Sequence, residues 1–300
     1  MMNACRLISR DAGPSVALAT PFAWPASGLE PLPWFPFTVA ASSGQAAAAA
    51  RIAQRTERAY WYLRRALCVT PRFRLLVLDA NDWAQHAEVS TFGVTHVTAD
   101  GHLIVGSEPA DAWHDVSRHL AKCLPPATVR SLVNVHGADA VYPDGPDLSG
   151  VAEALIAHEL AHVIADQAGA DFGRRWLGEA FADYALVAML GETDPSGLHR
   201  IGTLAEAARM LADATPTVAE FEAAAGSMAP AALILLHLDF TRAGFAAYAD
   251  AQAVPLARWF ELARDGQAAL REPDADHELG PWLARNVHPA FAQVAARRNG

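Results

Sequence analysis

The chain is poor in cysteine and has no long hydrophobic run. Its 300 residues contain three widely spaced cysteines, which are Cys5, Cys68 and Cys123. Such spacing forms neither a disulfide framework nor a thiolate zinc site, so a reducing compartment is the simpler inference. No run of about eighteen apolar residues is free of both charge and proline, which argues against a membrane-spanning helix.

The chain also lacks a basic stripe and a clear targeting segment. The formal net charge is −10, and the arginine pairs at 64–65, 174–175 and 297–298 are isolated. This charge pattern disfavours nucleic acids and anionic membrane surfaces as partners. Near the amino terminus Pro21 and Pro25 interrupt a weak apolar stretch, which makes a poor signal peptide. We expect a soluble cytoplasmic protein, with export left open.

The strongest motif in the chain is His158-Glu159-Leu160-Ala161-His162. Its flanks are apolar and contain no proline or glycine before Gly169, which predicts a buried helix. Residues four apart share a helix face, so His158 and His162 can hold one zinc ion. Glu159 then lies beside the ion, where it can act as general base on a water molecule. The alternative is a core helix whose histidines bond to backbone or carboxylate groups.

A catalytic zinc site usually needs a third protein ligand, and a second apolar helical pattern supplies a candidate. This pattern begins at Trp176 and is predicted to end at Gly191, and its first half carries only two acids, Glu179 and Asp183. The two acids are four residues apart and therefore share a face. Glu179 is placed to bind the ion, and Asp183 to accept a ring N–H from a ligand histidine. Taken alone, the pair would also suit an ordinary helix with two solvated acids.

The segments AHELAHVIAD and WLGEAFADY resemble the active-site helices of gluzincin zinc metallopeptidases. The resemblance is closest to the smaller bacterial peptidases of the MA-like type, and the second segment is similar to the aminopeptidase N branch. It implies a thermolysin-like catalytic domain that binds one Zn²⁺. It further implies that His158, His162 and Glu179 are the zinc ligands, that Glu159 is the general base and that Asp183 supports a ligand histidine.

Two short strands are predicted upstream, at 73–78 and 101–106. The family places a small sheet before the motif helix, with an edge strand along the cleft. If residues His102, Leu103, Ile104 and Val105 form that edge, their backbone can pair with an extended peptide substrate. The equal alternative is a simple core strand.

The sequence departs from the aminopeptidase pattern where that family has an oxyanion-binding tyrosine. Our alignment puts Met228 in that position. Loss of an oxyanion donor typically costs about 3–4 kcal/mol of barrier, so a substitute matters. Candidates are His237, on the same predicted helix, together with Tyr184 and Tyr248. The Gly-x-Met-Glu-Asn element that captures a substrate amino terminus is missing too, which argues against a dedicated aminopeptidase.

The predicted fold class is α+β, with a small mixed sheet lobe, a mainly helical lobe and the zinc cleft between them. We divide the chain into a Pro/Trp-rich segment (1–43), a mixed lobe with the edge strand (44–146) and a helical zinc-binding lobe (147–300). Further helices are expected at 44–70, 110–123, 204–214, 218–225, 231–243, 256–265 and 288–298, and a short strand at 132–135.

The sequence therefore predicts a zinc-dependent peptidase acting on a peptide or protein substrate through metal-activated water. Two alternatives remain open. One is a non-catalytic zinc-binding protein, which the missing tyrosine favours and Glu159 opposes. The other is a zinc hydrolase of a non-peptide amide or ester. Cleavage specificity and oligomeric state are not determined by the sequence.

Overall fold

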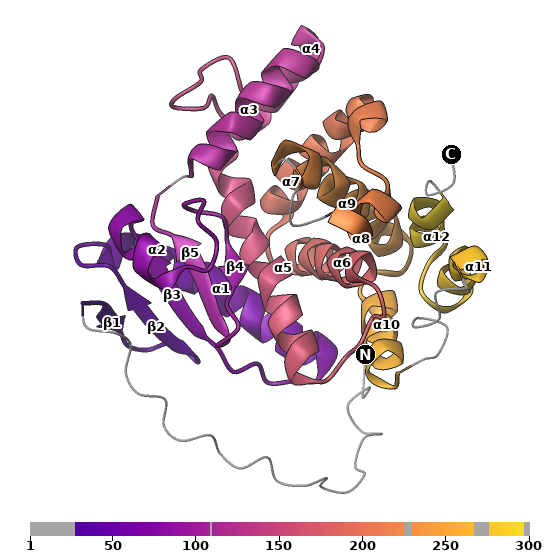
Figure 1. The fold of residues 1–300 in the computed structure, drawn as a ribbon, viewed down its shortest axis with the longest axis horizontal. Helices are drawn as coiled ribbons and strands as arrows, with labels where there is room; N and C mark the ends of the chain where they lie inside the picture. The colour runs from indigo at the N-terminus through magenta and orange to yellow at the C-terminus, as the bar shows by residue number, and fades with distance from the viewer. Residues whose placement is uncertain (1–27, 109, 225–227, 229, 267–275, 297–300) are drawn as a thin grey trace, which may run out of the picture.

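The computed structural model describes residues 28–108, 110–224, 228, 230–266 and 276–296 (Figure 1). The strands are β1 (Glu30–Leu32), β2 (Thr38–Ala41), β3 (Arg74–Leu78), β4 (His96–Val97) and β5 (His102–Gly106). The helices of the first half are α1 (Ala46–Leu67), α2 (Ala80–His86), α3 (Asp111–Cys123), α4 (Pro126–His136) and α5 (Ser149–Gln167). Those that follow are α6 (Arg175–Thr193), α7 (Pro195–Ala208), the 3₁₀ helix η1 (Arg209–Ala214), α8 (Val218–Ala224), α9 (Pro230–Ala251), α10 (Val254–Arg264), α11 (Asp276–Asn286) and α12 (Pro289–Ala296).

The predicted α+β class is confirmed, because a mixed sheet in the first part of the chain is followed by a mainly helical region. The helix α5 runs between the sheet and the helices that follow it (Figure 1). The predicted boundary at 146–147 falls in the connection between α4 and α5. Most of the Pro/Trp-rich segment lies outside the described residues, and its final part supplies β1 and β2. Within the described part of the chain, no helix is long and apolar enough to cross a membrane.

Alternation along the strands gives the sheet two buried faces. The order is β1-β2-β3-β5-β4, with parallel pairing of β2, β3 and β5 and antiparallel β1 and β4 at the two edges. Leu75 and Val77 face the main core, which α1 shares. Leu76 and Leu78 point the other way, into a smaller cluster with Trp83 of α2. Burial on both faces is typical of parallel strands and explains their nearly continuous apolar sequence.

Of the two alternatives for residues 102–105, the edge of the sheet is wrong, and the structure shows the core strand. The strand β5 pairs with β3 on one side and with β4 on the other, through Leu103 opposite Val97 and Ile104 opposite His96. The edge belongs to the two-residue strand β4, which no apolar run marked in the sequence. Because their backbone groups are already paired, Leu103 and Ile104 are not free for strand addition.

Two further predictions differ from the structure. The strand expected at 132–135 is wrong, because these residues lie within helix α4, which begins at Pro126. Proline suits the first turn of a helix, and Val129 and Leu132 are buried three residues apart on one face. Helix α6, which carries Glu179 and Asp183, continues to Thr193 past Gly191, where the ring of Tyr248 occupies the space that a side chain would need.

Candidate metal centre

Helix α5 carries the predicted motif, and its residues from Ile156 to Ala165 are buried or partly buried. His158 is 4 % exposed, and Leu160 and Ala161 between the histidines are fully buried. The helix ends as predicted, because Gly169 follows it with a positive φ of 67° that glycine adopts without strain. The buried neighbours hold the helix against α6, so His158 and His162 keep fixed positions.

Helix α6 supplies Glu179 and Asp183 from the facing side. Its first turn is held by α8, since the backbone N–H of Trp176 donates to Glu222 at 2.8 Å. Helix α9 packs closely on it at Gly244, where a Cβ atom would lie 3.3 Å from the Cα of Tyr184. Sequence reasoning missed the role of Glu222, and no pattern connects it to a helix that begins forty-seven residues earlier.

Three potential ligand atoms converge between α5 and α6. Nε2 of His158 lies 3.1 Å from Nε2 of His162 and 3.1 Å from Oε2 of Glu179, and the third distance, from His162 to Glu179, is 3.2 Å. A tetrahedral zinc ion with ligands at about 2.0–2.1 Å separates its ligand atoms by roughly 3.3 Å. The structure thus brings the three predicted ligands into a triangle of nearly the required size.

The donor chemistry of this triangle also suits a cation. The Asp183 carboxylate can only accept, so Nδ1 of His158, 3.1 Å from Oδ1, carries the proton of the neutral ring. Nε2 of His158 then presents a lone pair towards Glu179 and His162, which offer lone pairs of their own. Facing lone pairs at this distance are unfavourable unless a proton or a metal ion lies among them.

The charged groups of the site shift the pKa values of His158 and Glu179 in opposite directions. Burial disfavours the imidazolium form of His158, but Asp183 and Glu179 outweigh it and raise its pKa well above the usual value. Burial likewise opposes ionisation of Glu179, but hydrogen bonds from the two histidines hold its pKa well below the usual value. The site therefore stabilises positive charge among its nitrogen and oxygen atoms, as a cation site must.

Asp183 links the ligand triangle to a third histidine. It is 1 % exposed, and its Oδ2 lies 2.9 Å from Nδ1 of His237 on α9. Burial opposes its ionisation, but His237 and His158 outweigh burial and lower its pKa. Burial also opposes the charge on His237, whose pKa the Asp183 carboxylate nevertheless raises. His158, Asp183 and His237 form a second grouping that could hold a metal, but their hydrogen bonds already satisfy Asp183.

Glu159 lies on the same helix as the two histidines and is partly buried. Burial is the largest influence on its carboxyl group and raises the pKa, while the charges of His158 and His162 oppose the rise. Glu159 follows His158 directly in α5 and is not among the three ligand atoms of the triangle.

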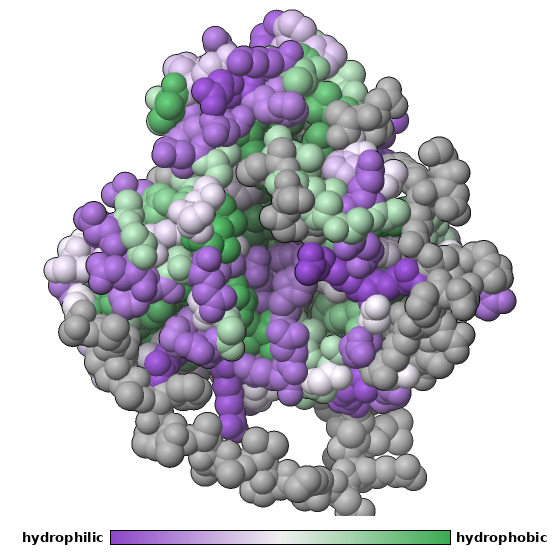
Figure 2. Space-filling view, in the orientation of Figure 1, coloured by the Kyte–Doolittle hydropathy of each residue, from purple (hydrophilic) through white to green (hydrophobic). Residues whose placement is uncertain are grey.

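The triangle is open on one side. The side chains of His162 and Glu179 are 26 % and 21 % exposed, whereas that of His158 is 5 % exposed. The molecular surface is hollowed near α5, between the sheet and the helices of the second half (Figure 2). An ion at the triangle would therefore be reachable from solvent, as substrate access requires.

Of the three oxyanion candidates, only His237 reaches the site. The hydroxyl of Tyr184 donates to the backbone carbonyl of Gln252, and the ring is fully buried against Phe291. Tyr248 packs on Gly191, about twelve residues along α6 from Glu179, which corresponds to roughly 18 Å of helix. The two tyrosines are therefore structural, and the structure corrects their proposed role.

No family model, curated protein or solved structure matches this chain, so its function must be argued from the geometry of the site.

Proposed function

We propose that the protein is a zinc-dependent hydrolase of peptide bonds, similar in its site to the gluzincin metallopeptidases. The observation that carries the proposal is the convergence of Nε2 of His158, Nε2 of His162 and Oε2 of Glu179 within 3.1–3.2 Å of one another. Three such ligands with one open side are typical of catalytic zinc, because a structural site is usually closed by four protein ligands.

His158, His162 and Glu179 would hold the ion. Zinc bound there supplies Lewis acidity, which polarises a carbonyl group and lowers the pKa of a water molecule. The chain provides the proton transfers. Glu159 takes a proton from the attacking water and delivers it to the departing amine, for which its position beside the triangle and its raised pKa are suitable.

His237 would take the role of the missing tyrosine. Asp183 holds its Nδ1, so the ring is oriented by a buried carboxylate and its other nitrogen is directed away from that partner. The raised pKa of His237 favours the imidazolium form, in which Nε2 carries a proton. In that form His237 donates a hydrogen bond to the substrate carbonyl oxygen as negative charge develops on it.

The retained base and the His237 pair favour catalysis over a purely structural zinc site. A non-catalytic zinc protein needs neither Glu159 nor an oriented donor on a third helix. Hydrolysis of a non-peptide amide or ester would use the same groups. Only the substrate would distinguish such an enzyme from a peptidase.

The proposal is tested with a diverse peptide library. The protein is incubated with the library after zinc loading, after chelation and after zinc is restored, and the products are identified by mass spectrometry. We expect cleavage that chelation abolishes and zinc restores. Stoichiometric zinc without any cleavage of peptides would contradict the proposal and favour one of the two alternatives.

A further inference from the structure

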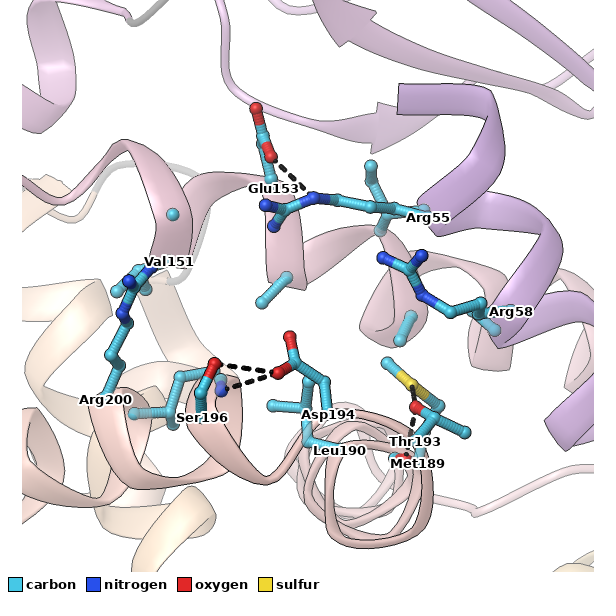
Figure 3. Close-up of a pocket in the computed structure, with 17 residues that line it drawn as sticks. Arg55, Arg58, Val151, Glu153, Met189, Leu190, Thr193, Asp194, Ser196 and Arg200 are labelled. Carbon is cyan, nitrogen blue, oxygen red and sulfur yellow. Dashed lines mark hydrogen bonds and ion pairs between the residues drawn. The ribbon is translucent and has the colours of Figure 1, made fainter. Parts of the chain in front are cut away.

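A second polar site lies between helices α1, α5, α6 and α7. It is a cavity of about 220 Å³ whose walls include Arg55 and Arg58 of α1, Arg200 of α7 and the acids Glu153 and Asp194. Arg55 and Arg58 extend over the cavity from one side, and Arg200 lies on the opposite side (Figure 3). Three guanidinium groups on one small cavity are unusual in a chain with a formal charge of −10.

Three arginines of α1 share one face of that helix. Arg51, Arg55 and Arg58 follow the spacing of three and four residues that aligns side chains along a helix. Arg51 and Arg55 both pair with Glu153, the latter at 2.9 Å. One carboxylate therefore serves two guanidinium groups.

The remaining acid of the cavity is already engaged. Asp194 accepts from the backbone N–H of Gly197 and the hydroxyl of Ser196, each at 3.0 Å, and so caps the start of α7. Within the described part of the chain, neither Arg58 nor Arg200 forms an ion pair. The cavity thus has two guanidinium groups whose donors are not used by protein carboxylates.

The electrostatic effect of this crowding is visible at Arg55. Burial first, and then the positive charges of Arg51 and Arg58, lower its pKa. Arginine stays protonated at any physiological pH, so the lowered pKa expresses mainly the cost of burying this guanidinium, to which the neighbouring cations add. A bound anion would relieve it.

A second cavity, of about 200 Å³, adjoins the first. It shares Arg55, Gly150, Glu153 and Arg200 with the first and adds Arg51, His136, Asp147 and Ser149. Nε2 of His136 is buried and has no hydrogen-bond partner. The first turn of α5 borders both cavities, and the Asp147 carboxylate accepts from the backbone N–H of Ser149 at 2.9 Å and so already caps this end of the helix.

We propose that these two cavities form a binding site for a small anion that carries a phosphate or carboxylate group. Arg58 and Arg200 supply the principal charged donors, with Arg55 already oriented by Glu153. Arginine binds both groups well because its planar donors match two oxygens at once.

The anion site is separate from the metal centre. Gly150 precedes His158 by eight residues, or about 12 Å of helix. At 100° per residue, the face with Gly150 and Glu153 is turned away from the face with His158 and His162. The proposal therefore does not rest on the proposed hydrolase function, and it predicts the same anion binding in zinc-free protein.

The test is calorimetric titration of the full chain with inorganic phosphate and, separately, with citrate, against chloride at equal ionic strength. We expect one site per chain, and Arg58→Gln and Arg200→Gln should each weaken binding about tenfold or more. Arg130→Gln is the matched control, because Arg130 is exposed on α4 and lines neither cavity. Thermal unfolding without added anion verifies that each variant is folded.

Binding of phosphate, of citrate or of both supports the proposal and indicates which group the site prefers. Failure of both to bind the wild-type protein would overturn it. Equal weakening by Arg130→Gln and the two cavity variants would overturn it too, since that result would mean attraction to overall charge rather than to a site.

Discussion

The carboxylate of Asp183 lies 2.9 Å from Nδ1 of His237, a residue fifty-four positions further along the chain. The other oxygen of the same carboxylate lies 3.1 Å from Nδ1 of His158. One buried acid therefore orients both a candidate zinc ligand and a candidate oxyanion donor. This arrangement means that ligand and donor roles can be separated by mutation of the histidines but not by mutation of Asp183.

Replacement of His237 tests the donor role. His237→Ala should keep zinc, because the ligand triangle is untouched, and should lower kcat by about 10²–10³ with a smaller change in KM. Zinc content and steady-state kinetics on a cleaved library peptide measure both effects. Tyr248→Phe is the control and should keep full activity, because Tyr248 packs against Gly191 away from the site. Unchanged kcat in His237→Ala would remove His237 from the mechanism.

Replacement of Asp183 should affect both roles together. Asp183→Asn keeps the volume of the side chain, but an amide cannot accept from both histidines through two equivalent charged oxygens. We expect zinc affinity to fall about 10–100-fold and kcat to fall even at saturating zinc. Competition with a fluorescent chelator gives the affinity. A variant with normal affinity and reduced kcat would show that Asp183 acts through His237 alone.

The ligands are tested by metal content. His158→Ala and Glu179→Ala should each lose zinc during dialysis, since two remaining ligands bind zinc weakly. Elemental analysis of the dialysed proteins measures the loss. His136→Ala offers a histidine control outside the triangle and should keep one zinc ion. Full zinc content in either ligand variant would refute its role as a ligand.

A separate prediction concerns acid stability through Asp139. This residue is 3 % exposed and accepts from Nδ1 of His114 at 2.7 Å and from the N–H groups of Val141 and Tyr142. Burial opposes its ionisation, but these hydrogen bonds, that of His114 foremost, outweigh burial and lower its pKa.

A lowered pKa in the folded state stabilises the protein above the unfolded-state value near about 3.9, and this stabilisation is lost as pH falls through the folded value. Asp139→Asn should therefore reduce the free energy of unfolding by about 1–3 kcal/mol at pH 5. The difference should shrink below about pH 4. Urea unfolding between pH 3 and 5 measures it, and a difference independent of pH in that range would contradict the assignment.

Much of the site could be predicted because its chemistry lies in two local patterns. The spacing of His158 and His162, and that of Glu179 and Asp183, follow directly from helix geometry, and the structure brings all four together. The pairing of His237 with Asp183 depends on how α9 packs on α6, which no local pattern records. The choice between His237 and the two tyrosines therefore required the structure.

In the fold, too, elements with a local sequence pattern were predicted, whereas elements that depend on distant parts of the chain were not. Helices α1, α3, α5, α6, α9 and α10 were found from periodicity, as were β3 and β5. Helices α4 and α11 were not, and the helix expected at 204–214 covers only the end of α7 and the 3₁₀ helix η1. Strands β1, β2 and β4 are two to four residues long, too short for a periodic signal, and they exist because neighbouring strands pair with them. The short strand β4 also explains why β5 is not the edge of the sheet, because β4 pairs with the side of β5 that faces away from β3.

The central claim is that Glu159 activates water at a zinc ion, and Glu159→Gln tests it most directly. The amide is nearly the same size but cannot take a proton, and the three ligands are unchanged. Zinc content and cleavage of the same library peptide are measured in wild-type and variant proteins. We predict one zinc ion per chain in both, with hydrolysis reduced by about 10²–10⁴ in the variant. Hydrolysis by Glu159→Gln at the wild-type rate would contradict it.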